Sequence, residues 1–269
     1  MDNRHDGRPR GVMSGFIPSS DGRSNLKRAA QVFEVDEIGA DSRQIEKVWA
    51  TQSTAEPAFI SVAESHWQIV VTTHLGETRV VIQGPSDHAR ISPIPPEAEF
   101  FGVVLRLGTF MPAVSLAHLV GRADVRPNAT SRTFWLAGSR WEIPTPENAD
   151  VFVDRLMRQE ILGEDRFVAR SLQAEDAAVS LRTMQRRVRR ATGMTQSTIR
   201  QITRAHEAVD ALACGALPVD VAIGLGYADQ AHLTRSLRRF IGQTPAQVLS
   251  SGFHWSASSP LRSGIVIRS

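Results

Sequence analysis

Two stretches of this chain place arginine side chains at matching positions, and both also carry glutamine. Ser180–Gln196 aligns without a gap on Asp229–Pro245, 49 positions further on. Five pairs of identical residues recur in the two copies: Arg186 and Arg235, Arg189 and Arg238, Arg190 and Arg239, Gly193 and Gly242, Thr195 and Thr244. A guanidinium can bond bidentately to guanine or hold a phosphate, and a glutamine amide can bond bidentately to adenine. The repeat therefore favours recognition of a polyanion.

Helical signals accompany both copies. Each opens on a good N-cap residue, Ser180 or Asp229, and each ends at a glycine suited to the C′ position. With the apolar positions turned inward, the outward residues are Arg182, Gln185, Arg186 and Arg189 in the first helix, and Gln230, Ala231, His232, Arg235 and Arg238 in the second. Side chains near the N-terminal ends can read bases. Arg190 and Arg239, near the C-terminal ends, are expected to touch phosphate or solvent.

Charge is unevenly distributed along the chain. The formal net charge is only +3, yet the 25 residues from Ser180 to Arg204 hold seven arginines and no acid. Such a surplus is typical of a phosphate-binding surface, although a solvated helix face could also produce it.

The surrounding pattern predicts how these helices are held. From Ala149 the apolar residues follow a helical period, with a long helix over Thr195–Ala213 and a shorter one over Val219–Leu225. A short helix, a tight turn and a capped basic helix form a helix-turn-helix, whose second helix lies in the major groove. The two turns are expected at Gln173–Val179 and Gly226–Ala228.

The first half of the chain shows strand signals instead. Segments 59–62, 67–73, 78–83 and 100–107 are rich in β-branched and aromatic residues, and His74–Glu77 suits a hairpin turn. A short helix is expected over Ala113–Val120. The predicted fold class is α+β: a flexible arm over residues 1–29, a small β domain or partial barrel over 30–145, an all-α domain with two helix-turn-helix units over 149–250, and a tail over 251–269.

Residues 149–250 resemble the AraC/XylS family of bacterial transcription regulators. The strongest part of the resemblance is Pro218–Pro245, where Gly226, an aromatic residue at 227, a basic pair, Gly242 and Pro245 stand together. The resemblance implies two helix-turn-helix units joined by the helix from Thr195. It places base contacts at Arg182, Gln185 and Arg186, and at Gln230, Ala231, His232 and Arg235. It also suggests a cupin-like N-terminal domain that binds an effector, dimerises, or both.

Other chemistry has weaker support. His66, His74, His88 and His118 are scattered without the close spacing of a metal-binding cupin. Four of the five tryptophans, at 49, 67, 135 and 141, could line an apolar pocket, but we expect core residues. Cys214, the only cysteine, is expected to be a buried, inert thiol. We expect no catalytic residues, no metal and no cofactor.

The expected activity is therefore sequence-specific regulation of transcription. The expected partners are double-stranded DNA and RNA polymerase, with a small effector or a second copy of the chain as candidates for the N-terminal domain. Two alternatives stay open: a bifunctional enzyme with a catalytic β-barrel fused to a DNA-binding module, and a constitutive architectural binder without an effector. No secretory segment and no long apolar run occur, so we expect a cytoplasmic protein without membrane contact.

Overall fold

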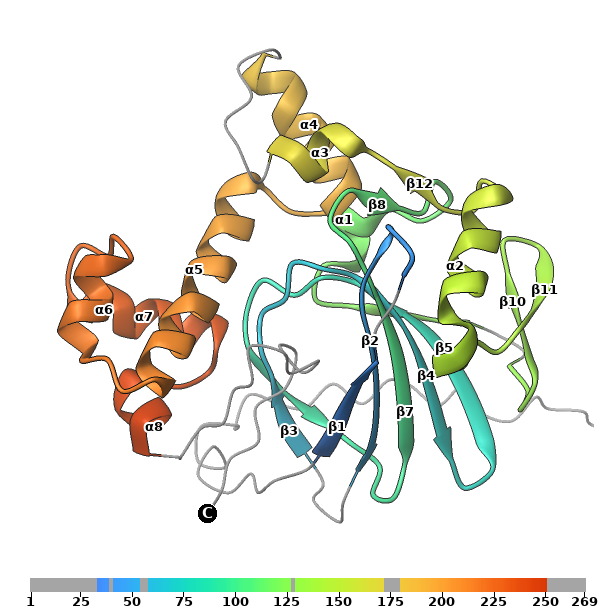
Figure 1. Ribbon diagram of the computed structural model, residues 1–269, viewed down its shortest axis with the longest axis horizontal. Coiled ribbons are helices and arrows are strands. Elements are labelled where there is room, and N and C mark those ends of the chain that lie inside the picture. Colours follow the sequence, from blue (N-terminus) through green and yellow to red (C-terminus); the bar gives the residue numbers. More distant parts are fainter. Residues whose placement is uncertain (1–32, 39–40, 54–57, 127–128, 172–179, 251–269) are drawn as a thin grey trace, which may run out of the picture.

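The computed structural model describes residues 33–38, 41–53, 58–126, 129–171 and 180–250 (Figure 1). A β-rich N-terminal part is followed by a helical C-terminal part, which confirms the predicted α+β class. The predicted arm over 1–29, the first turn at 173–179 and the tail over 251–269 lie outside the described residues.

One open sheet dominates the N-terminal part. Its six antiparallel strands lie in the order β1-β2-β7-β4-β5-β9. Their bounds are Phe33–Ile38 (β1), Ile45–Ser53 (β2), Glu99–Leu105 (β7), Gln68–His74 (β4), Glu77–Gln83 (β5) and Ala123–Arg126 (β9). Three short pairs complete the strands: β3 (Ala58–Ser61) with β6 (Arg90–Pro93), β10 (Thr133–Leu136) with β11 (Ser139–Glu142), and β8 (Thr109–Phe110) with β12 (Gly163–Glu164). Within the described residues the sheet does not close into a barrel.

Local turn chemistry explains the β4–β5 hairpin. His74 pairs with Glu77, and the two residues between them, Leu75 and Gly76, have φ angles of 50° and 77°. Two positive φ angles in a two-residue loop match the turn whose twist suits a hairpin. The hairpin predicted at His74–Glu77 is confirmed, as are strands at the four predicted segments, now β3, β4, β5 and β7. The predicted helix at Ala113–Val120 is present as the shorter α1, Leu116–Leu119.

A first hydrophobic core lies on one face of the sheet. Helix α2 (Ala149–Arg158), which follows a 3-10 turn at Pro146–Asn148, buries Phe152, Val153 and Leu156 there. The ring of Phe152 meets Trp141 of β11 edge-on, with 6.0 Å between the ring centroids. Helix α2 thus shares its core with the sheet, although its sequence period resembles that of the helices that follow. This packing favours a domain boundary after α2, and the predicted domain limits stay a prediction.

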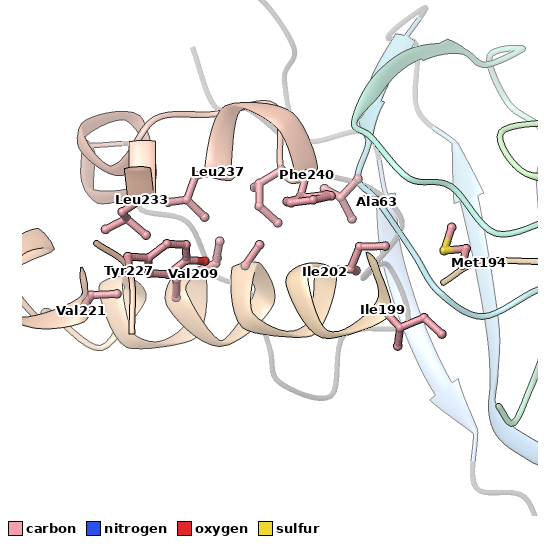
Figure 2. Packing of buried hydrophobic residues seen from close by; sticks show 14 of the residues in the cluster. Ala63, Met194, Ile199, Ile202, Val209, Val221, Tyr227, Leu233, Leu237 and Phe240 are labelled. Carbon is pink, nitrogen blue, oxygen red and sulfur yellow. The ribbon is translucent and has the colours of Figure 1, made fainter. Parts of the chain in front are cut away.

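The second core lies among the C-terminal helices. These are α3 (Arg166–Ser171), α4 (Leu181–Thr192), α5 (Gln196–Ala213), α6 (Pro218–Gly224), α7 (Gln230–Phe240) and α8 (Pro245–Ser250). Figure 2 shows Leu233, Leu237 and Phe240 of α7 opposite Ile202 and Val209 of α5. All five side chains are buried, so α5 supports α7 along several turns.

The N-terminal part contributes to this second core. Ala63, just after β3, lies beside Phe240 (Figure 2) and donates its N–H to the Phe240 carbonyl at 2.7 Å. The Ala63 carbonyl accepts a hydrogen bond from Nε2 of the buried His206 at 2.9 Å. Ala89 donates its N–H to the Arg239 carbonyl, also at 2.7 Å. The sheet and the helical part are therefore joined by specific contacts.

Two expectations about single residues are corrected. Cys214 is exposed, because it caps the end of α5 instead of continuing its apolar face. Trp135 of β10 is 44% exposed, whereas Trp49, Trp67 and Trp141 are buried as expected. Trp135 alternates with the buried Phe134 and Leu136, so the strand period turns it outward.

Candidate nucleic-acid interface

Helix α4 has the boundaries that its sequence predicts. The hydroxyl of Ser180 accepts a hydrogen bond from the N–H of Thr183. Met184, Val188 and Ala191 are buried in the second core. The helix ends at Gly193, whose φ of 75° is left-handed and whose N–H donates to the Arg189 carbonyl. The N-cap, the apolar face and the C-terminal glycine of α4 thus all agree with the sequence prediction.

The outer face of α4 carries the predicted recognition residues. Arg182, Gln185, Arg186, Arg189 and Arg190 are all exposed. In the part of the chain that the structure describes, Arg182, Arg186 and Arg189 have no carboxylate partner. Their charge is available to an external ligand.

Two other arginines of α4 are held by the protein. Arg187 donates two hydrogen bonds to the carboxylate of Asp165, at 2.8 and 2.9 Å, and its guanidinium stacks on Phe167. Burial alone would raise the pKa of Asp165, but the bonds from Arg187 and from the first turn of α3 hold that pKa below its usual range. Arg190 lies over the ring of Phe110 in β8, 5.2 Å from its centroid. The C-terminal half of α4 is thereby tied to neighbouring elements.

Helix α7 repeats the design of α4. Asp229 accepts a hydrogen bond from the N–H of His232 at 2.6 Å, so it caps the helix as expected. Gly242, with a φ of 80°, follows the last turn. Gln230, Ala231, Arg235, Arg238 and Arg239 are exposed.

His232 departs from the outward orientation expected for it. Its side chain is half-buried, and its ring meets Tyr227 edge-on at 5.3 Å. Its Nδ1 accepts a hydrogen bond from the N–H of Ala228. One edge of the His232 imidazole is therefore hydrogen-bonded to the turn before α7, and that edge is not available to an external ligand.

The second helix-turn-helix turn has the predicted glycine conformation. Gly226 has a φ of 69°, which only glycine adopts at low cost. Tyr227 is buried beneath it, and its hydroxyl lies 3.4 Å from the Ser236 hydroxyl of α7. Arg204 of α5 stacks on the Tyr227 ring at 4.4 Å and donates to the Gly226 carbonyl. These contacts fix α5 against the turn.

A polar groove runs between α4 and α5, with a volume of about 630 Å³. It is lined by Gln185, Arg189, Thr195, Gln196, Ser197, Arg200, Gln201 and Arg204. Sequence reasoning counted Arg200 and Arg204 toward the local charge but gave neither a role. Their i, i+4 spacing on a predicted helix could have shown that they share a face.

The histidines considered as metal ligands are dispersed. His66 contacts Glu64 at 2.7 Å and His88 contacts Asp87 at 2.8 Å. Burial would raise the pKa of Glu64, but the nearby His66, with smaller contributions from His206 and Lys47, lowers it far below its usual range. Among the described residues, His, Cys, Asp and Glu side chains form no group of three or more suited to a metal. The described helices include none with the length and apolar character needed to cross a bilayer.

Comparison with known proteins gives one family match, in the helical part of the chain. A family described as "Helix-turn-helix domain" matches residues 173–251. Among solved structures, ToxT from Vibrio cholerae is similar at 8% identity and a TM-score of 0.35, over 81% of this chain and 98% of that chain. A search of curated proteins gives no match.

The fold and the family match define a helix-turn-helix DNA-binding protein. Residues 173–251 match this helix-turn-helix family, and the protein is a DNA-binding transcription regulator. The structure displays three features of the sequence pattern at Pro218–Pro245: the capped helix α7, the turn at Gly226–Tyr227 and the glycine at 242.

Proposed function

We propose that the protein regulates transcription by reading two adjacent major-groove segments with α4 and α7. The observation that carries this proposal is the repetition of exposed arginines, unpaired among the described residues, at equivalent places on two capped helices, above all Arg186 and Arg235. A solvated helix face would not require the same residues at the same register in two copies.

The length of α5 suits such an arrangement. Its 18 residues extend for about 27 Å at 1.5 Å per residue. Successive major-groove segments on one face of DNA are about 34 Å apart. A rigid helix of this length between α4 and the second unit can set the separation of two recognition helices.

The roles of the side chains follow from their places on the helices. Base reading is assigned to Arg182, Gln185 and Arg186 on α4, and to Gln230, His232 and Arg235 on α7. Arg189 and Arg238, further along each helix, are assigned to phosphate together with Arg190 and Arg239. Because the guanidinium of Arg190 stacks on Phe110, Arg190 is a weaker candidate for a phosphate contact than Arg189.

The N-terminal domain is assigned to control by a small effector or by dimerisation, with RNA polymerase as the partner in transcription. A hollow of about 610 Å³ supports the effector. It lies between β2, β4, β7 and the segment Ile143–Pro146, where Phe100 and Phe101 offer apolar surface and Gln52 and Thr73 offer hydrogen bonds. Such a regulator would act in the cytoplasm, where bacterial DNA lies.

Selection of duplexes from a random-sequence pool by the full chain tests this function. We expect enrichment of a site with two conserved segments centred about 10–10.5 base pairs apart, protected on one face of the DNA. A single conserved segment in one groove would contradict the use of two helices. Failure to enrich any sequence would contradict sequence-specific regulation.

A further inference from the structure

The groove between α4 and α5 has the chemistry of an anion site. Its walls carry three arginines, Arg189 from α4 and Arg200 and Arg204 from α5, and the other lining residues are hydroxyl or amide side chains. None of the lining residues is acidic. Guanidinium, amide and hydroxyl groups are the donors that proteins present to phosphate oxygens.

The arginines differ in how firmly they are held. Arg189 and Arg200 are exposed and, within the described part of the chain, have no ion-pair or hydrogen-bond partner. Arg204 is anchored on Tyr227 and Gly226, at the turn that leads into α7. The basic surface therefore runs from the first recognition helix to the N-terminal end of the second. Glu207, also exposed, is the next charged residue of α5 beyond Arg204.

We propose that this groove binds the phosphates of the DNA backbone between the two major-groove segments. The inference rests on the proposed function, because it requires α4 and α7 to engage the same duplex. Arg200 and Arg204 lie about 6 Å apart along the helix axis. Over a similar length of axis each DNA strand carries about two phosphates. The linking helix thus contributes affinity that does not depend on sequence.

Replacement of Arg200 tests the proposal, because this side chain is exposed and its loss leaves the fold intact. The probes are the duplex enriched by the full chain and a mixed-sequence duplex. We expect Arg200→Ala to weaken both complexes by the same factor, about five- to tenfold near ~0.1 M salt, and to reduce the slope of log affinity against log salt by about one. The order of preference among single-base variants should not change.

Matched variants separate this effect from general charge. Arg140→Ala removes an exposed arginine from β11, remote from the groove, and should leave affinity and salt slope unchanged. Arg200→Lys keeps the charge and should retain most of the salt slope. Ethylation of phosphates between the two protected segments should weaken binding of the wild-type chain and have a smaller effect on Arg200→Ala.

The proposal would be overturned if Arg200→Ala bound DNA with wild-type affinity and wild-type salt slope. It would also be overturned if Arg200→Ala changed the base preference, or if ethylation of the phosphates between the two protected segments did not weaken binding of the wild-type chain. These results are distinguishable from failure of the proposed function. If the full chain enriches a two-segment site and Arg200→Ala behaves as wild type, only the groove is wrongly assigned. If no site is enriched, salt slopes on the mixed-sequence duplex still decide whether Arg200 meets phosphate.

Discussion

Helices α4 and α7 share one design but are held in place by different surroundings. Helix α7 packs against α5, α6 and α8, and only its last turn, at Arg239 and Phe240, also bonds Ala89 and Ala63 of the N-terminal part. Helix α4 lies against α1 and β8 as well as α3 and α5, and Phe110 of β8 joins both hydrophobic cores. Both repeat units therefore receive support from the β-rich domain, α7 at its C-terminal end and α4 through β8 and α1.

The position equivalent to Arg187 illustrates the difference. In the second copy this place is occupied by Ser236, which is buried beside the Tyr227 hydroxyl. In the first copy, Arg187 turns to Asp165 at the start of α3. The two copies are therefore anchored by different partners at this position.

Shortening the chain to residues 163–250 should produce the largest effect. Without β8 and α1, α4 loses neighbours that cover its C-terminal half, and a helix of 12 residues is marginal alone. We expect amide hydrogen exchange in α4 to approach that of a fraying segment, while α7 stays protected in the turns that pack on α5, α6 and α8. The full chain, with both helices protected, is the control. Equal protection of α4 and α7 in the fragment would show that the first unit needs no support from the sheet.

Glycine replacements sharpen the same comparison. A Cβ on Gly193 would lie 2.6 Å from the Leu116 carbonyl oxygen, whereas one on Gly242 would meet side-chain methyl groups of Ile60 and Ala89 at 3.0 and 3.2 Å. Both positions also carry the cost of a left-handed alanine, about 1–2 kcal/mol. We expect Gly193→Ala to lower the free energy of unfolding by about 3 kcal/mol or more, and Gly242→Ala by about 1–2 kcal/mol.

Urea unfolding measures this difference. Gly215→Ala is the matched control. Gly215 also has a left-handed φ, of 88°, but an added Cβ would have no atom within 4 Å, so this variant measures the cost of backbone strain alone. If Gly193→Ala cost no more than Gly215→Ala, the contact between α4 and α1 would not be a close one.

A smaller effect is expected at Asp165, which caps α3 and pairs with Arg187. Asp165→Ala should lower the free energy of unfolding by about 1–2 kcal/mol at neutral pH, mostly through the lost cap. Because the folded-state pKa of Asp165 is lowered, the charged form stabilises the fold above the ordinary aspartate pKa. That stabilisation disappears as the pH falls through the folded-state value.

The difference between wild type and Asp165→Ala should therefore shrink in acid, as measured by urea unfolding over a pH series. Asp229→Ala, which removes the α7 cap without removing an arginine partner, is the comparison at neutral pH. A difference that grew as the pH fell would contradict the lowered pKa.

Local signals account for what the sequence predicted well. The caps Ser180 and Asp229 and the glycines 193, 226 and 242 act within a few residues of their own position, and the structure has each of them as expected. The β4–β5 hairpin is equally local. In each case the conformation depends on backbone sterics and nearby hydrogen bonds.

Contacts between distant segments account for the rest. No local pattern shows that α2 buries Phe152 on the sheet, that Arg190 stacks on Phe110, or that Ala63 reaches Phe240. The half-buried state of His232 depends on Tyr227 and the turn before α7. Helical periodicity shows that a face is apolar but not which surface covers it.

The most direct test of two recognition helices is a comparison of Arg186→Ala with Arg235→Ala. Affinity would be measured for the enriched duplex and for all its single-base variants at two salt concentrations. Each replacement should cost about 1–3 kcal/mol and relax preference at one base position, with the two positions in different major-groove segments. Two variants that keep the wild-type order of sequence preference and share one salt-dependent loss would contradict the account.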